Sequence, residues 1–156
     1  MKNYFLSILL LLCLVLSRLS FAASGIPTFK VIGQDMTSFS ILVPQNTTKE
    51  QLKALIYEFR NTRKNNKLPS LIPGAAKGGQ QLGVIWIFVF SEPDWATTNK
   101  LQKFIKSSLK SATDKQFDKE YVKHIKAEYY YSSLGEYGNF GYDDGIVRSP
   151  NYKKLF

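Results

Sequence analysis

Cysteine and histidine are almost absent from this sequence of 156 residues. The single cysteine, Cys13, lies in an apolar run near the start, and the single histidine is His124. A disulfide needs two cysteines, and the usual zinc sites need several cysteine or histidine ligands at defined spacings. Glycine-rich loops with the spacing of phosphate-binding motifs are missing too. We therefore predict no metal ion and no cofactor, and a fold that is stabilised by packing alone.

Long apolar runs are equally scarce, and the one at the start of the chain covers residues 4–16. Its 13 residues are too few for a membrane-spanning helix, which takes about 20. Lys2 gives the segment a basic start, and Ser20 and Ala22 place small residues where a signal peptidase cuts. We predict a signal peptide at residues 1–22. The product is then exported, periplasmic or extracellular, and keeps no transmembrane helix after cleavage.

Acidic residues and arginines are few compared with lysines. The chain has a formal net charge of +9, and because Lys2 and Arg18 carry two of these charges, residues 23–156 keep +7. Such a charge attracts anionic partners at long range. Lysine is a point charge, whereas arginine makes forked, planar contacts to phosphate. The composition thus favours loose association with an anionic envelope polymer or another exported protein over sequence-specific recognition of nucleic acid.

Strand patterns occur in three parts of residues 23–156, which are short enough for a single domain. Residues 84–90 are seven consecutive apolar residues, which is typical of a strand covered on both faces. Alternating apolar residues predict two short strands within residues 28–44 and a further strand at residues 121–132.

Two amphipathic helices are predicted between these strands, at residues 48–66 and from residue 96 onward. Thr47 and Glu50 have the spacing of a capping box at the start of the first helix. The expected fold class is α+β. It is a two-layer sandwich with a mixed four-stranded sheet and two helices on one face, in the order β-β-α-β-α-β.

Two segments have no sustained period. Residues 68–83 contain several prolines and glycines and predict a long loop. Residues 134–156 predict a Gly/Tyr-rich tail with loops or a short edge strand and a frayed end. Long loops are often functional, so the 68–83 loop is a candidate for contact with another protein.

Lysines recur on the outer face of the second predicted helix, and seven of the nine tyrosines come after residue 120. A lysine-rich helix face is often only a solvated surface, but it also suits docking on acidic lipids or envelope phosphates. Tyrosine offers a rigid apolar ring with a polar tip, which suits stacking on sugars, bases or a protein partner. The candidate binding residues are Lys100, Lys103, Lys106, Lys110, Lys126, Tyr130, Tyr137 and Tyr142.

Signals for catalysis are weak. His124 is the default general base because histidine changes charge near neutral pH. On the predicted strand at residues 121–132 it shares a face with Lys126, Glu128 and Tyr130, and Glu128 is its candidate helper. The same residues also fit an exposed sheet surface without any chemistry. We therefore name His124 and Glu128 as candidates without assigning a reaction.

Together these features predict an exported, basic, non-enzymatic binding or accessory module of the cell envelope. Two alternatives stay open. One is a small hydrolase of an envelope polymer that uses His124. The other is a secreted inhibitor or toxin-like protein that acts through the 68–83 loop.

Overall fold

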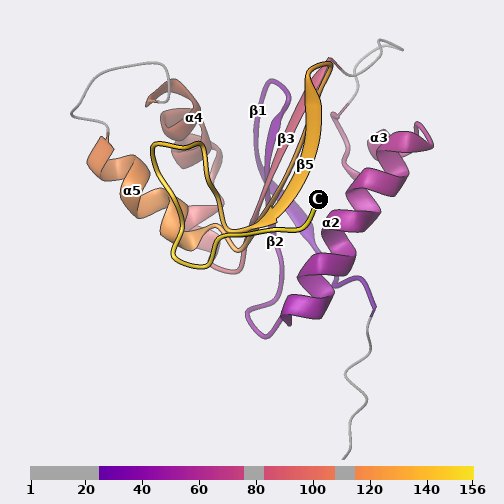
Figure 1. Cartoon of the computed structure of the whole chain (residues 1–156), viewed down its shortest axis with the longest axis horizontal. Helices are drawn as coiled ribbons and strands as arrows, with labels where there is room; N and C mark the ends of the chain where they lie inside the picture. Colours follow the sequence, from indigo (N-terminus) through magenta and orange to yellow (C-terminus); the bar gives the residue numbers. More distant parts are fainter. Residues whose placement is uncertain (1–24, 76–82, 108–114) are drawn as a thin grey trace, which may run out of the picture.

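The computed structural model describes residues 25–75, 83–107 and 115–156 and contains a six-stranded sheet with helices on both faces (Figure 1). The predicted mixture of α and β structure is confirmed. The four-stranded sheet, the stated order of elements and the placement of both helices on one face are wrong. No helix in the described ranges is long and apolar enough to cross a membrane. The predicted signal peptide at residues 1–22 lies outside the described residues.

The sheet follows the order of the chain, and each strand is hydrogen-bonded to the next one. Only the pair β2 and β3 is parallel, and all other pairs are antiparallel. A parallel pair needs a long crossover connection. The strands are β1 (Lys30–Asp35), β2 (Ser38–Leu42), β3 (Val84–Phe90), β4 (Ala127–Ser132), β5 (Gly135–Phe140) and β6 (Lys153–Lys154).

Helix α2 belongs to the crossover between β2 and β3 and covers one face of the sheet, whereas α4 and α5 lie on the opposite face (Figure 1). Two short helices complete the described elements. The bounds are α2 (Lys49–Lys64), α3 (Leu68–Leu71), η1 (Pro93–Trp95), α4 (Thr98–Ser107) and α5 (Lys115–His124). The predicted 68–83 loop is thus wrong at its start, where α3 forms and buries Leu68. Residues 76–82 lie outside the described residues.

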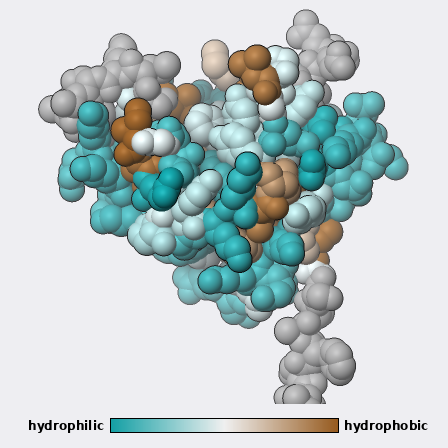
Figure 2. Space-filling view, in the orientation of Figure 1, coloured by the Kyte–Doolittle hydropathy of each residue, from teal (hydrophilic) through white to brown (hydrophobic). Residues whose placement is uncertain are grey.

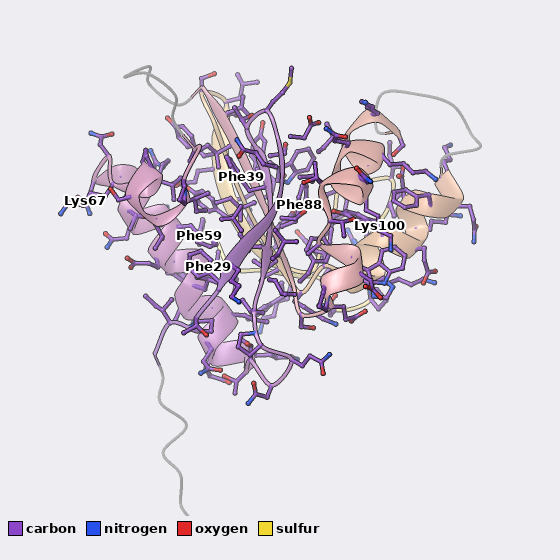
Figure 3. All side chains as sticks on the ribbon, turned by 180° about the vertical axis from the view of Figure 1, so that it is seen from behind. Phe29, Phe39, Phe59, Lys67, Phe88 and Lys100 are labelled. Atoms are coloured by element: carbon purple, nitrogen blue, oxygen red, sulfur yellow. The ribbon has the colours of Figure 1, made fainter. Side chains whose placement is uncertain are left out.

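The protein has three layers, which are α2, the sheet, and α4 with α5, and a separate hydrophobic core lies on each face of the sheet. Ile87 belongs to the core under α2, together with Phe59, while the next strand residue, Phe88, belongs to the core under α4 and α5. Figure 3 shows Phe29 and Phe59 on the α2 side of the sheet and Phe88 toward α4. Successive side chains on a strand point to opposite faces. A strand that is apolar at every position therefore has to be covered on both faces, as residues 84–90 predict, and in the structure helices cover both.

The predicted strand at residues 121–132 is wrong in its first part. Residues 115–124 form α5, whose buried residues include Asp118, Tyr121 and Val122 at helical spacing. Tyr121 and Ile125 are four residues apart, a spacing that places them on one face of a helix as well as of a strand. The apparent alternation therefore fitted both structures, and His124 is at the end of a helix instead of on a sheet.

The C-terminal tail is ordered over residues 134–156 and contains β5 and β6. The backbone N–H of Leu155 donates to the carbonyl of Gly138 at 2.8 Å. The Phe156 ring packs between Tyr57, at 5.1 Å between ring centroids, and the guanidinium of Arg60, at 4.2 Å from the ring centroid. The frayed end that the sequence predicts is therefore wrong, because these last residues cover the free side of β5 under α2.

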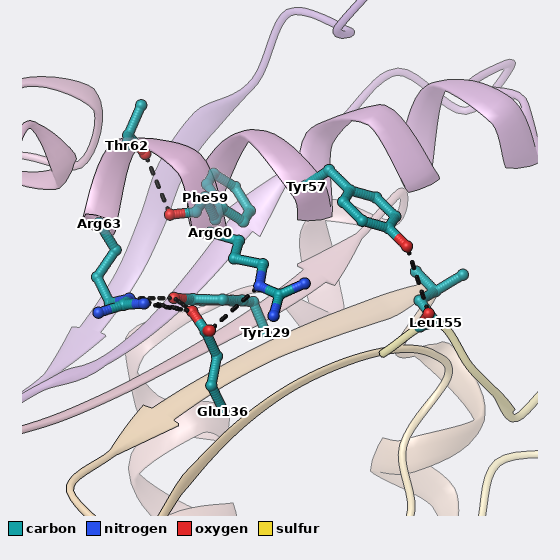
Figure 4. Close-up of polar contacts among 8 residues, drawn as sticks. All are labelled: Tyr57, Phe59, Arg60, Thr62, Arg63, Tyr129, Glu136 and Leu155. Atoms are coloured by element: carbon teal, nitrogen blue, oxygen red, sulfur yellow. Dashed lines mark hydrogen bonds and ion pairs between the residues drawn. The ribbon is translucent and has the colours of Figure 1, made fainter. Parts of the chain in front are cut away.

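A group of polar side chains joins α2 to β4 and β5 (Figure 4). The Glu136 carboxylate accepts hydrogen bonds from Arg60 at 3.1 Å, Arg63 at 3.0 Å and the Tyr129 hydroxyl at 2.8 Å. Burial raises the pKa of Glu136, but the hydrogen bond from Tyr129 and the two arginines outweigh burial and leave the pKa below its usual value. Because every member has a partner, we interpret this group as structural.

The close packing of β5 against α2 gives a stability prediction. Gly138→Ala should lower the free energy of unfolding by about 1–3 kcal/mol, because the added Cβ would lie 2.7 Å from Cζ of Phe156 and closer still to the Ile56 side chain. Urea unfolding of the purified protein measures the change. Gly135→Ala on the same strand is the control, since a Cβ there meets nothing within 4 Å. Equal losses in the two variants would show that Gly138 is not tightly packed.

Candidate functional site

A groove of about 480 Å³ lies where the start of α2 meets the start of β4 and the C-terminal segment. In Figure 1 this segment, drawn in yellow, crosses from the α5 side of the molecule toward α2. Four lysines from three parts of the chain line the groove, and Leu52 and Phe140 add apolar surface. The lysines are Lys49, Lys53, Lys126 and Lys153. We call this site the lysine groove.

The first two lysines are held in place by the start of α2. Thr48 is the N-cap residue: its hydroxyl accepts the N–H of Gln51 at 3.2 Å, and the Gln51 side chain accepts the N–H of Thr48 at 2.9 Å. The capping box is therefore one residue later than the sequence predicts. This start places Lys49 and Lys53 four residues apart, on one side of the first turns.

The position of these lysines is electrostatically unfavourable without an anion. The N-terminus of a helix carries a partial positive charge that falls off beyond the first turn, so a lysine at the first position of α2, Lys49, is disfavoured. Like charges four residues apart on a helix also repel each other. Among the described residues, Lys49, Lys53 and Lys153 form no ion pair. A bound anion would relieve both costs.

The fourth lysine is paired with a carboxylate that it shares with the histidine. Glu92, two residues after β3, accepts a hydrogen bond from Lys126 Nζ at 3.1 Å and lies 2.5 Å from His124 Nδ1. Burial raises the pKa of Glu92, but the hydrogen bonds from Lys126 and His124 outweigh it and keep the pKa below its usual value. The other ring nitrogen of His124, Nε2, lies 3.5 Å from Glu120. Trp95 stacks on the imidazole at 4.0 Å between centroids.

Glu128 lies in different surroundings from His124. It is 0% exposed on β4, where Trp86 donates its indole N–H at 3.2 Å and Asn139 donates its amide N–H at 2.8 Å. Burial raises the pKa of Glu128 to about 7, although the bonds from Asn139 and Trp86 act in the opposite direction. The structure thus gives the two candidate catalytic residues separate partners, and the carboxylate beside the histidine is Glu92.

The lysines predicted on the outer face of the second helix have different surroundings in the structure. Lys100 Nζ lies 3.8 Å from the centroid of the Trp95 ring, and Lys103 Nζ lies 4.3 Å from that of Phe117. Lys106 is exposed on α4, and Lys110 lies outside the described residues. Two of the predicted lysines therefore pack over aromatic rings, and of the predicted lysines that the structure describes only Lys126 lines the groove.

The predicted tyrosines form two groups. Tyr130 and Tyr137 are half-buried neighbours on β4 and β5, with ring centroids 4.9 Å apart, and Trp86 packs edge-on against Tyr130 at 5.7 Å. Tyr142 is 1% exposed and donates its hydroxyl to Asp144 at 3.0 Å. Tyr142 is therefore a core residue, while Tyr130 and Tyr137 keep part of their surface in contact with solvent.

The sequence analysis did not identify four of the site residues, which are Lys49, Lys53, Lys153 and Glu92.

Comparison with protein-family models, curated proteins and solved structures finds no match for this chain. Within the described ranges, no group of three or more His, Cys, Asp or Glu residues could hold a metal ion. Hydrophilic residues cover most of the face in Figure 2, and the apolar residues there form small separate patches. The lysine groove is thus the candidate site that the geometry favours.

The buried carboxyl gives a prediction for the dependence of stability on pH. Because burial raises the pKa of Glu128 to about 7 in the fold, from an ordinary value of 4.5, the folded state favours the protonated form. The free energy of unfolding should therefore fall by about 3 kcal/mol as pH rises from about 4.5 to above 7. Glu128→Gln should remove this part of the pH dependence and be more stable than the unsubstituted protein at alkaline pH.

Urea unfolding of both proteins from acid to mildly alkaline pH tests this prediction, and the difference between the two curves isolates Glu128. Glu136→Gln is the matched control, since the pKa of Glu136 is lowered and this carboxylate stabilises the fold when it is charged. Parallel pH curves for the unsubstituted protein and Glu128→Gln would contradict the prediction.

Proposed function

We propose that this protein is a non-enzymatic binding module of the cell envelope that holds an anionic polymer in the lysine groove. The observation that carries the proposal is the convergence of four lysines from α2, the junction before β4, and β6 on one groove. The basic composition supports it, because residues 23–156 keep a net charge of +7 out of the +9 of the whole chain. The signal peptide predicted at residues 1–22 supports an envelope or extracellular location.

The chemistry of the groove favours recognition of charge. Ammonium groups attract phosphate or sulfate as point charges and lack the forked geometry of arginine. Leu52 and Phe140 supply apolar surface that can contact the uncharged part of a polymer repeat. Glu50 is the acid of the groove lining and limits its net positive charge. The proposed ligand is therefore a polymer with repeated phosphate or sulfate groups, bound reversibly and weakened by salt.

Binding to a rhodamine-labelled dextran sulfate and to a poly(glycerol phosphate) tests the proposal by fluorescence anisotropy, with neutral dextran as the blank. Both polyanions should bind at low ionic strength and dissociate as salt rises through physiological strength. The triple variant Lys49→Gln, Lys53→Gln, Lys153→Gln should bind roughly tenfold more weakly, since each lost ion pair is worth up to about 1 kcal/mol.

A matched triple variant controls for the loss of net charge. Lys67→Gln, Lys106→Gln and Lys119→Gln remove the same number of charges from exposed positions outside the groove. Figure 3 shows Lys67 on the α2 side, and this residue lies just beyond the C-terminal end of α2, whereas the groove is at its N-terminal end. The control should bind nearly as well as the unsubstituted protein. Equal losses in the two triple variants would mean that diffuse charge, and no defined groove, attracts the polymer.

A hydrolase is the second candidate, because one observation favours it. The imidazole of His124 lies 2.5 Å from the Glu92 carboxylate, and a carboxylate in that position orients a general base. In this case the helper of His124 is Glu92 in place of Glu128. Product release from the same polyanions by the unsubstituted protein, and its loss in His124→Gln, would support the enzyme. Turnover that persists in His124→Gln would exclude this base.

A further inference from the structure

We infer that protonation of His124 strengthens the hold of the lysine groove on its anion, because His124 and Lys126 share the single carboxylate of Glu92. This inference rests on the proposed function and concerns the regulation of the same site. Glu92 Oε1 accepts from Lys126 Nζ at 3.1 Å, while Glu92 Oε2 faces His124 Nδ1 at 2.5 Å. Lys126 is at the same time one of the residues that line the groove.

The imidazole of His124 lies between two carboxylates. Nδ1 faces Glu92, and Nε2 lies 3.5 Å from Glu120, so a carboxylate lies beside each ring nitrogen. A neutral imidazole can donate only one of these hydrogen bonds, and its other nitrogen would turn a lone pair toward a carboxylate. The imidazolium donates both. Histidine is the side chain that changes charge between about pH 5 and 8, and this chain has only one.

Other charged groups around His124 are already paired. Lys123 Nζ lies 2.7 Å from the Glu120 carboxylate. Lys100 Nζ lies 3.8 Å from the centroid of the Trp95 ring, which stacks on the imidazole of His124. Glu120 and Glu92 both have a lowered pKa: for Glu120 the hydrogen bond from Lys123 is the main cause, and for Glu92 the bonds from Lys126 and His124 outweigh burial. Both carboxylates therefore stay ionised while the histidine gains or loses its proton.

The consequence for the groove follows from the charges. When His124 is neutral, the Glu92 carboxylate is left to Lys126 and offsets its positive charge. When His124 is protonated, the cluster gains one positive charge, and Glu92 is shared between two cations. Both changes raise the positive potential at Lys126, which lines the groove. The affinity for a polymer of fixed negative charge should then increase by roughly two- to fivefold from about pH 8 to about pH 5.5.

The pH response is measured with rhodamine-labelled dextran sulfate at constant low ionic strength, because sulfate esters and the dye keep their charge over this range. Three variants separate the contributions. His124→Gln should bind with the weak affinity of the alkaline form at every pH. Glu92→Gln should bind at alkaline pH nearly as tightly as the unsubstituted protein does in acid, and its response to pH should shrink.

Glu128→Gln is the third variant and serves as the control, because Glu128 is two residues from Lys126, which directly precedes β4, and also changes charge near neutral pH. This variant should keep most of the pH response. Circular dichroism at each pH checks that every variant is folded under the conditions of the binding measurement.

The outcomes distinguish the inference from the proposed function. If no variant and no pH gives binding that depends on Lys49, Lys53 and Lys153, the proposed function itself fails. If the groove binds the polymer but the affinity is the same at both pH values, or if His124→Gln keeps the full response, only the inference is overturned. A response that disappears in Glu128→Gln would assign the effect to the buried carboxyl and would also overturn it.

Discussion

The structure depends on the burial of residues 87–90 of β3 from both sides of the sheet. Ile87 and Phe88 are neighbours on this strand, point to opposite faces and are each fully buried. Burying a side chain of this size contributes about 1.5–3 kcal/mol, so neither face can be left open to water. One helix layer therefore has to lie on each side of the sheet, and α2 on one side with α4 and α5 on the other supply these layers.

The positions of the site residues follow from the pairing of this central strand. Val89 pairs with Ala127, and the N–H of Lys126 donates to the Val89 carbonyl at 2.8 Å, so the start of β4 lies beside the end of β3. Glu92 follows β3 after a single intervening residue, which brings its carboxylate to Lys126. Phe140 at the end of β5 pairs with Lys153 on β6, and this pairing places Lys153 at the groove. Register, more than any local motif, thus assembles charges that are far apart in the sequence.

The sequence predicted what depends on local periodicity. The strand at residues 84–90 and the amphipathic helix predicted at residues 48–66 were correct, because burial on both faces of a strand, or on one face of a helix, leaves a pattern in a single segment. His124 was misplaced because Tyr121 and Ile125 fit both periods. The helix layers were misplaced because periodicity identifies the apolar face of a helix without saying which side of a sheet it covers. Lys153 carries no local signal, since only the pairing of β5 with β6 brings it to the groove.

Two groups near β4 respond to acidification in ways that support each other. A proton on Glu128 removes a buried charge whose only described side-chain partners are the neutral groups of Trp86 and Asn139. A proton on His124 adds a charge at the surface, between the carboxylates of Glu92 and Glu120. The first change favours the fold, and the second favours an anion in the groove. Their causes are independent, because the first depends on desolvation inside the sheet and the second on pairing at its edge. In the binding module that we propose, the two changes act in the same direction: one adds to the stability of the fold, and the other adds to the affinity for a polyanion, which concentrates cations around itself.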